Sequence, residues 1–294
     1  MVNRPTLLAP LKLLKLRIVV VAGGLVISYE SAVAQLSDTL REAISLKKDA
    51  LSFFHRSLNA EKKIFLSPTQ WNDRDWMTLA ILLSGGGMIM GNDREIFHQI
   101  QDWRSGTGDR VARYFAEPIG SGLLSLPLLA VMYAGGRIGD NPRIAQAAMA
   151  GASAFVVTVF NVQIMKSLMG RERPTKTDNP YVFHGPTLRN DALPSGHTAV
   201  AFAMATAIAT CYDDNPWLNA GLWATAALTG WSRINDGKHW PSDVFAGAVL
   251  GYYMGRWVGR QWKMDRAGKT LSSISLQPML APQGTGFRLA WNLR

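Results

Sequence analysis

The chain has 294 residues, of which 48% are hydrophobic and 18% charged, so it can bury a sizeable core and lacks the composition of a disordered protein. Its formal net charge of +10 favours anionic partners, and because it carries no nucleic-acid-binding module or aromatic-basic stripe we expect no nucleic-acid partner. A single cysteine, Cys211, excludes an intramolecular disulfide, and no Cys/His cluster in the sequence indicates zinc.

The first 34 residues have the pattern of a secretory signal peptide. Basic residues between Arg4 and Arg17 precede the short apolar run Ile18–Ile27, and Ala32–Ala34 supplies the small-x-small pattern of a cleavage site. Because the apolar run is too short to span a bilayer comfortably, we predict cleavage before Gln35 rather than an uncleaved membrane anchor. The mature protein is therefore expected to be exported.

The chain after this leader is predicted to be helical. An amphipathic pattern from Leu36 to about Lys63 predicts an N-terminal helix, Ser67–Trp71 predicts a loop, and Asp75 is expected to cap the next helix. The Gly and Ala residues that follow permit close helix–helix approach. Six apolar helices, separated by polar loops, are predicted at Trp76–Met90, Pro118–Ala134, Ile144–Met165, Thr198–Ala209, Trp217–Trp231 and Ser242–Val258.

The composition changes after Arg266. Polar and apolar residues alternate in Ser272–Leu276 and in Phe287–Leu293, with Pro and Gly between them, which predicts a short C-terminal β-hairpin. We therefore expect an all-α fold: a bundle of about six core helices with an N-terminal amphipathic helix and this hairpin. The predicted parts are the leader at 1–34, a helical segment at 35–75, the main helical domain at 76–266 and a tail at 267–294.

The first polar cluster ends the third predicted apolar helix. Lys166 and Arg173 are separated by six residues, and Pro174 follows. Two cations near one helix terminus can converge on a phosphate, where Arg offers a planar fork for two oxygens and Lys a compact charge. The alternative is that the pair complements the helix dipole or stays solvated.

The second cluster is Pro194-Ser195-Gly196-His197, directly before the fourth helix. A Ser-Gly step that opens a helix presents backbone N–H groups and the positive end of the dipole to an anion. The Ser195 hydroxyl adds a donor, Gly196 allows close backbone approach, and His197 can transfer a proton. By itself, the same pattern is also that of an ordinary helix N-cap.

The third cluster runs from Ser232 to Asp243. Asp243 follows His239 by four residues, so the two share one face if a helix begins near His239. A carboxylate bonded to one ring nitrogen fixes the tautomer and makes the other nitrogen a better nucleophile. Arg233 adds a third cation for phosphate. The alternative is a surface histidine near a helix-capping residue.

Taken together and in this order, the three clusters resemble the signature of the type 2 phosphatidic acid phosphatase superfamily, which also includes bacterial acid phosphatases and vanadium haloperoxidases. The signature is Lys-x6-Arg-Pro, Pro-Ser-Gly-His and Ser-Arg-x5-His-x3-Asp, and every position is present in this sequence. The resemblance covers roughly residues 76–260.

The resemblance also implies a role for each matching residue. His239 would attack phosphorus and form a phosphohistidine, Asp243 would orient His239, and His197 would protonate the leaving oxygen and then activate water. The phosphoryl oxygens would be held by Lys166, Arg173, Ser195, Gly196 and Arg233. Because these cations can neutralise the charge that Mg²⁺ neutralises in other enzymes, we expect neither a metal nor a cofactor.

The function implied by the resemblance is that of a metal-independent phosphatase acting on a phosphomonoester or diphosphate. A phosphorylated lipid is favoured as substrate over a small soluble phosphoester. Two alternatives remain at this point: a vanadium-dependent haloperoxidase, and a non-catalytic protein of the cell envelope. The oligomeric state is not predicted.

Members of this superfamily occur both as six-span membrane proteins and as soluble enzymes. Here several apolar segments have only about 12–17 residues, short of the ~20 that a span requires, and only Ile144–Met165 is long enough. An export signal followed by six spans would also leave Lys166, Arg173 and Ser195 in the cytoplasm, whereas membrane members of this superfamily normally place the site on the outer side. We therefore expect an exported periplasmic or envelope-membrane-associated bundle with its active site outside the cytoplasm; the alternative is six spans without a signal peptide.

Overall fold

The structure is a computed structural model that describes residues 19–21, 24–26, 29–189, 191–269, 273–281 and 284–292, with side chains described for 39–189 and 191–263. The chain divides into two compact units, Met1–Ser52 and Phe53–Arg294. In the first unit, β1 (Val19–Val21) and β2 (Gly24–Val26) pair in antiparallel fashion. Most of the predicted leader lies outside the described residues, and the whole of it stays a prediction.

Helix α1 (Tyr29–Leu66) covers the predicted amphipathic segment, and the 3-10 turn η1 (Ser67–Gln70) follows it. Helix α2 (Asp73–Gly91) begins with a capping box rather than with the predicted cap at Asp75. The Asn72 side chain accepts hydrogen bonds from the first turn, and the Asp75 carboxylate accepts one from the Asn72 N–H at 3.0 Å. Asn72 is therefore the N-cap, and Asp75 is its reciprocal partner.

The remaining elements confirm an all-α fold. Five of the predicted apolar helices each appear as one helix: α2, α7 (Pro142–Met169), α8 (Gly196–Cys211), α9 (Pro216–Asn235) and α10 (Pro241–Lys269). The short elements α3 (Asp93–Asp102), α4 (Gly106–Val111) and the π-helical turn η2 (Ala112–Ala116) were not predicted. At the C-terminus, β3 (Ser273–Ala281) and β4 (Gly284–Asn292) pair in antiparallel fashion at the position of the predicted hairpin.

The predicted helix Pro118–Ala134 is wrong as a single element. The chain instead forms α5 (Glu117–Gly120) and α6 (Ser125–Ile138), with a break between them. Gly122 lies in that break with φ +87°, a backbone conformation that a continuing helix of L-residues cannot adopt. The axis bends by 57° between the Gly106–Gly120 stretch and α6.

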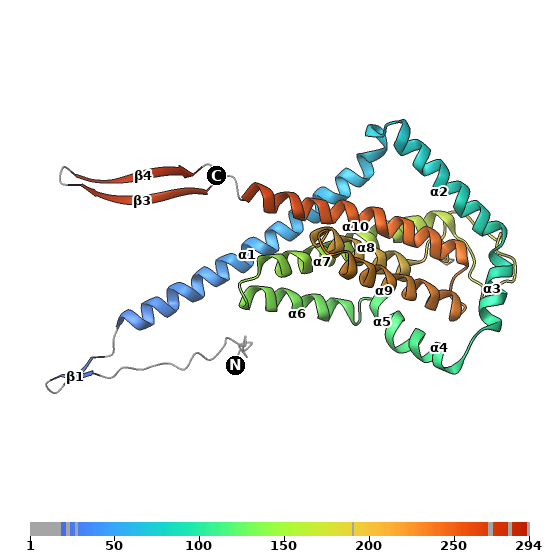
Figure 1. Cartoon of the computed structure of the whole chain (residues 1–294), viewed down its shortest axis with the longest axis horizontal. Helices are drawn as coiled ribbons and strands as arrows, with labels where there is room; N and C mark the ends of the chain where they lie inside the picture. The colour runs from blue at the N-terminus through green and yellow to red at the C-terminus, as the bar shows by residue number, and fades with distance from the viewer. Residues whose placement is uncertain are drawn as a thin grey trace. The chain divides into compact units, whose positions relative to one another are not determined.

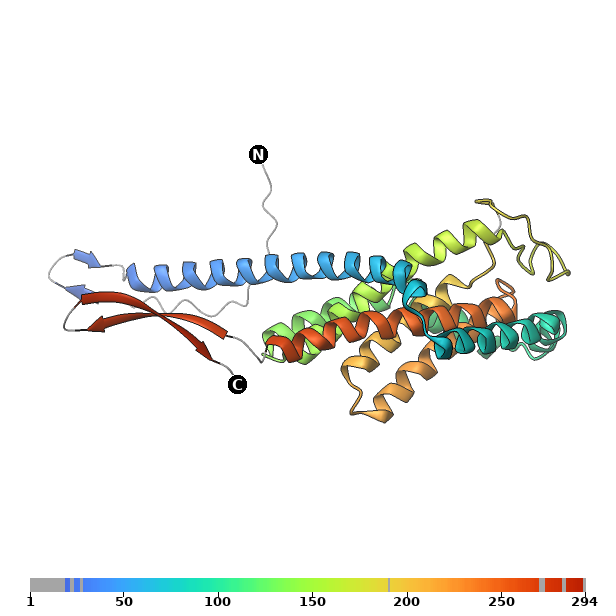
Figure 2. The same cartoon turned by 90° about the horizontal axis from the view of Figure 1, so that it is seen from above.

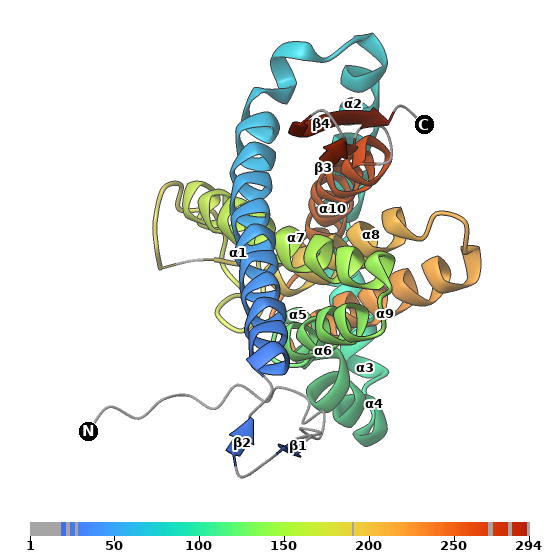
Figure 3. The same ribbon diagram turned by 90° about the vertical axis from the view of Figure 1, so that its left-hand side faces the viewer.

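Helix α8 lies at the centre of the second unit and packs against α7, α9 and α10 (Figure 1). Helix α2 lies beside α10 in the view of Figure 2, and α6 packs on α7, as Figure 3 shows. The core is built from small and branched apolar side chains, including Ala147, Val157, Ala203, Ala207 and Val258. The same arrangement brings the C-terminal end of α7 to the N-terminal ends of α8 and α10.

A stripe of glycines lets α10 approach the backbone of α8. Four glycines of α10 recur at every fourth position and face the carbonyl oxygens of Ser195, Ala199, Ala203 and Ala207; they are Gly247, Gly251, Gly255 and Gly259. A Cβ on Gly247 would lie only 2.5 Å from the Ser195 carbonyl oxygen, and one on Gly251 would overlap the Ala199 carbonyl oxygen. The contact between α8 and α10 therefore depends on the absence of side chains here.

By length and composition, one helix in the described part of the chain, α7, could cross a membrane. The bent pair formed by Gly106–Gly120 and α6 would add a second candidate if it counted as one span. Half of the apolar window of α7 is buried inside the bundle.

We predict that Gly251→Ala destabilises the protein by about 1–3 kcal/mol, because the added methyl forces the two helix backbones apart. The matched control is Gly221→Ala in α9, where an added Cβ would meet none of the described atoms within 4 Å. Thermal unfolding should show a lower midpoint for the first variant and an unchanged or higher midpoint for the second. Equal midpoints for Gly251→Ala and the wild type would contradict the close-contact interpretation.

Candidate active site

Two glycines with a left-handed backbone conformation turn the chain so that the predicted motifs lie in the same region. Gly170 ends α7 one turn after Lys166 with φ +59°, and a side chain there would overlap the Gly185 carbonyl oxygen. Gly237 has φ +67° and turns the chain after α9, so that the His239 N–H donates to the Arg233 carbonyl oxygen at 3.2 Å. Each of these turns needs a residue without a Cβ.

The ends of three helices meet through backbone contacts. The Ser195 N–H at the start of α8 donates to the Asp243 carbonyl oxygen in the first turn of α10 at 2.9 Å. A Cβ built on Gly196 would lie 3.6 Å from Cε of Lys166, which comes from the last turn of α7. The structure therefore brings together the first, second and third motifs, which the sequence separates widely.

His239 is buried, with only 2% of its surface exposed. Its Nδ1 lies 3.6 Å from Oδ2 of Asp243, which is beyond hydrogen-bond distance, and Nδ1 has no hydrogen-bond partner among the described residues. The expected bond between this carboxylate and the ring is therefore replaced by a close approach. Burial lowers the pKa of His239, against the raising effect of Asp243, and favours the neutral ring that a nucleophile requires.

His197 is also held neutral. Burial, followed by the charges of Arg233, His239 and Lys166, lowers the pKa of His197 to about 4, while Glu117 acts in the opposite direction. These effects place the second imidazole within electrostatic reach of His239 and of two cations. An anion bound among them would stabilise the protonated ring.

Lys166 and Arg173 share one carboxylate, that of Asp191. Arg173 donates through Nε and Nη2 to the two Asp191 oxygens, each at 2.8 Å. Lys166 Nζ donates to the Asp191 carbonyl oxygen and lies 3.7 Å from its Oδ2. Burial raises the pKa of Asp191, but Lys166 and Arg173 outweigh it and lower that pKa overall. Any anion that binds to these two cations has to displace this carboxylate or share the cations with it.

Arg233 and Ser195 complete the set of predicted anion ligands. Arg233 is buried and pairs with Asp236 at 2.6 Å and with Glu117 at 3.3 Å. Ser195 is the N-cap residue of α8, yet its hydroxyl makes no capping hydrogen bond to the described residues of that helix. It accepts one from the Thr198 hydroxyl at 2.9 Å instead. The Ser195 side chain therefore does not cap α8 in the ordinary way.

Sequence reasoning missed two buried charged residues beside the site, Arg171 and Asp93. Arg171 Nη1 donates to Oδ1 of Asp243 at 2.6 Å, and its Nη2 donates to Oδ2 of Asp93 at 2.7 Å. The only sequence signal was that Arg171 lies inside the first motif, at a position the signature leaves open. Asp93 belongs to no motif, and the helix that it begins, α3, lies where the sequence predicts a polar loop.

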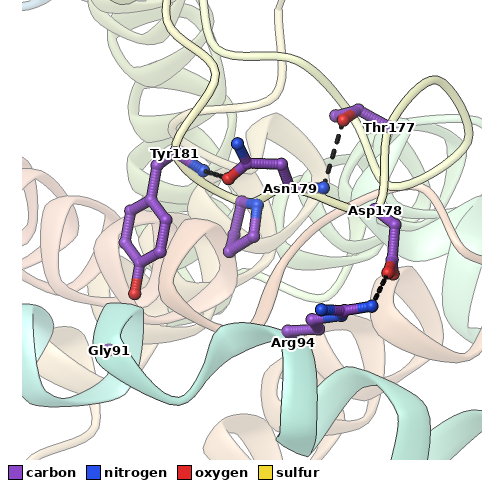
Figure 4. Close-up of a pocket in the computed structure, with 7 residues that line it drawn as sticks. Gly91, Arg94, Thr177, Asp178, Asn179 and Tyr181 are labelled. Atoms are coloured by element: carbon purple, nitrogen blue, oxygen red, sulfur yellow. Dashed lines mark hydrogen bonds and ion pairs between the residues drawn. The ribbon is translucent and has the colours of Figure 1, made fainter.

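A shallow pocket adjoins these buried residues (Figure 4). It is lined by Gly91, Arg94 and residues 177–181. Arg94 forms an ion pair with Asp178 across it, and the Pro180 carbonyl oxygen accepts from Arg171 Nε at 2.9 Å. None of the predicted site residues lines this pocket. Among the described residues, no three His, Cys, Asp or Glu side chains gather as metal ligands would.

Residues 145–267 match the PAP2 superfamily, and this stretch contains all three motifs. Over these residues the chain resembles the PAP2 superfamily. The match begins in α7 and ends in α10, so it covers the helices whose ends form the site. The predicted resemblance is confirmed.

Three curated relatives carry phosphatase names. The chain is 44% identical over 66 residues to the lipid A 1-phosphatase of Porphyromonas gingivalis, which covers 22% of this chain and 15% of that protein. It is 30% identical to the lipid A 4'-phosphatase of Bacteroides thetaiotaomicron, over 32% of this chain and 43% of that protein. It is 29% identical to the undecaprenyl-diphosphatase of Sulfolobus acidocaldarius, over 34% of this chain and 48% of that protein. The chain spans less than half the length of each of these relatives.

We predict that sulfate binds more tightly as the pH falls from 7 to 5. The pKa of His197 is about 4 without an anion. A bound dianion raises that pKa, so sulfate binding takes up a proton and its affinity rises with acidity, by at most about tenfold per pH unit for one proton. Titration calorimetry of the wild type and of His197→Gln across this range measures the effect. The same pH slope in both proteins would contradict it.

Proposed function

We propose that the protein is a phosphatase that hydrolyses a phosphate ester or diphosphate through a phosphohistidine on His239. The observation that carries the proposal is the pairing of two imidazoles in one site, both with a lowered pKa, beside Lys166 and Arg173. Phosphoryl transfer needs a nucleophile and a proton donor on opposite sides of phosphorus, with positive charge around its equatorial oxygens.

In the first step, Nε2 of His239 attacks phosphorus, the N–P bond forms and the bond to the leaving oxygen breaks. The bound phosphoryl group raises the pKa of His197, so that His197 carries the proton that the leaving oxygen takes. Three cations and the start of α8 stabilise the transferred group through Lys166, Arg173, Arg233, the Ser195 hydroxyl and the Gly196 N–H.

In the second step, His197 is neutral and accepts a proton from water. The water oxygen attacks phosphorus, the N–P bond breaks, and His239 is released as a neutral ring with phosphate as the product. The close carboxylate of Asp243 stabilises the positive charge that the His239 ring carries between the two steps. The cations neutralise the phosphoryl oxygens throughout, which is the work that Mg²⁺ does in kinases and GTPases.

A phosphorylated lipid is the substrate class that we favour. Two relatives are named lipid A phosphatases and a third is named an undecaprenyl-diphosphatase. The names of these similar proteins therefore all refer to lipid phosphates. The net charge of +10 also suits an anionic headgroup. The apolar residues exposed on the second unit, described next, would bring the site close to such a substrate.

We propose that the second unit contacts the lipid of the cell envelope. Large apolar side chains lie exposed on α2 and α6; Met88 is 74% and Val131 69% exposed. Other exposed side chains on these helices are Met77, Ile81, Leu83, Leu128 and Ile138. Clusters of large exposed apolar side chains mark a contact with membrane or with another protein.

We predict that the expressed protein sediments with envelope membranes, resists release by a high-salt wash and is released by detergent, because apolar contacts persist when charges are screened. Immunoblotting of each fraction measures this outcome. Recovery of the protein in the salt-washed supernatant would contradict lipid contact through these helices.

We predict phosphate release from a panel of a lipid A phosphate, an isoprenyl diphosphate and an aryl phosphate, with the highest kcat/KM on a lipid. His239→Ala should abolish release from every substrate, and His197→Ala should lower kcat by about 10²–10⁴-fold, the usual value of general acid–base catalysis. The matched control is His55→Ala, an exposed histidine of α1 outside the motifs. Circular dichroism confirms that the variants fold, and full activity in His239→Ala would exclude the phosphohistidine.

A further inference from the structure

A buried arginine joins two aspartates from distant elements behind the site. Arg171 follows the end of α7, Asp93 begins α3 and Asp243 lies in the first turn of α10. None of these three side chains is exposed to solvent. Arg171 Nη1 donates to Asp243 at 2.6 Å and its Nη2 to Asp93 at 2.7 Å.

The guanidinium group is held on its other sides as well. Nε and Nη2 both donate to the Pro180 carbonyl oxygen, at 2.9 and 2.7 Å, and Nη1 donates to Ser242 Oγ at 2.7 Å. Asp93 in turn accepts from the Ser242 N–H at 2.7 Å and from its hydroxyl at 2.5 Å. The planar fork of arginine is therefore fixed in position by groups from three parts of the chain.

This arrangement decides which oxygen of Asp243 remains for the nucleophile. Oδ1 accepts from Arg171, whereas Oδ2 accepts from the Trp240 N–H at 2.9 Å and lies 3.6 Å from Nδ1 of His239. The carboxylate therefore cannot rotate without breaking a buried charge-assisted hydrogen bond. With Oδ2 facing Nδ1, the other ring nitrogen, Nε2, is the one left to react.

The charges of the cluster also suit the reaction. Asp93, Arg171 and Asp243 together carry one net negative charge while His239 is neutral. When His239 bonds to phosphorus its ring becomes cationic, and the buried cluster becomes neutral. Without Arg171, two carboxylates would remain buried together, and a proton on one of them would be favoured over two charges.

We propose that Arg171, anchored by Asp93, is a positioning residue that fixes the Asp243 carboxylate and through it the reactive tautomer of His239. The proposal rests on the phosphohistidine function proposed above. It assigns to Arg171 no contact with the substrate, so loss of Arg171 should lower the rate of the chemical step and leave anion binding intact.

The first test is Arg171→Lys, which keeps the charge but loses the fork. We expect kcat to fall by about 10²-fold, as misplacement of a reacting group by about 1 Å costs, while KM and sulfate affinity change less than threefold. The control is Arg104→Lys, which removes the fork of an exposed arginine that pairs with Asp109 outside this cluster; its kcat should stay within about threefold of the wild type.

The second test separates positioning from stability. The double variant Arg171→Gln/Asp93→Asn removes one charge of each sign, so the net charge of the buried cluster is unchanged. If Arg171 only balances buried charge, this variant recovers wild-type kcat; if Arg171 positions Asp243, kcat stays about 10²-fold low although thermal unfolding and sulfate binding show a folded protein. Should the double variant fail to fold, the result for Arg171→Lys decides alone.

Wild-type kcat in Arg171→Lys, or an equal loss of kcat and sulfate affinity, would overturn the inference. His239→Ala is measured in parallel on the full chain. An inactive His239→Ala beside a fully active Arg171→Lys removes the positioning role and leaves the proposed function standing. An active His239→Ala removes the proposed function itself.

Discussion

The close contact between the backbones of α8 and α10 is the constraint on which the rest of the site depends. Glycine at every fourth position of α10 lets this helix lie against the carbonyl oxygens of α8, beginning with Gly247 at Ser195. The contact delivers the Ser195 N–H to the Asp243 carbonyl oxygen at 2.9 Å. Because helices are stiff, this single approach sets the relative positions of the second and third motifs.

Burial then determines the chemistry of the groups that this packing brings together. Removal of water lowers the pKa of both His197 and His239, so both rings are neutral until an anion arrives. The same burial lowers the pKa of Lys166 and strengthens its interaction with Asp191. In the function proposed above, an anion binds by replacing the Asp191 carboxylate as the partner of Lys166 and Arg173, and His197 gains a proton as it binds.

Much of the architecture could be predicted from local patterns. The apolar periodicity located α2, α7, α8, α9 and α10, because each is long and bounded by polar residues or proline. The prediction of a single helix at Pro118–Ala134 was wrong because the helix breaks at Gly122. A hydrophobic pattern does not reveal the positive φ of this residue. The short helices α3 and α4 were not predicted because they carry few apolar residues; in the structure α3 packs against α9 and α10, and α4 against η2 and α9.

The sequence by itself determined the chemical groups of the site and their order, because the motif spacing ties each cation and imidazole to a helix boundary. It also indicated the family resemblance, since these motifs lie inside the stretch 145–267 that matches the PAP2 superfamily. Only the tertiary structure decided which charges are partners: Arg171 and Asp93 lie 78 residues apart along the chain and meet without solvent. Ion pairs between residues so far apart in the chain result from helix packing, so no local sequence pattern predicts them.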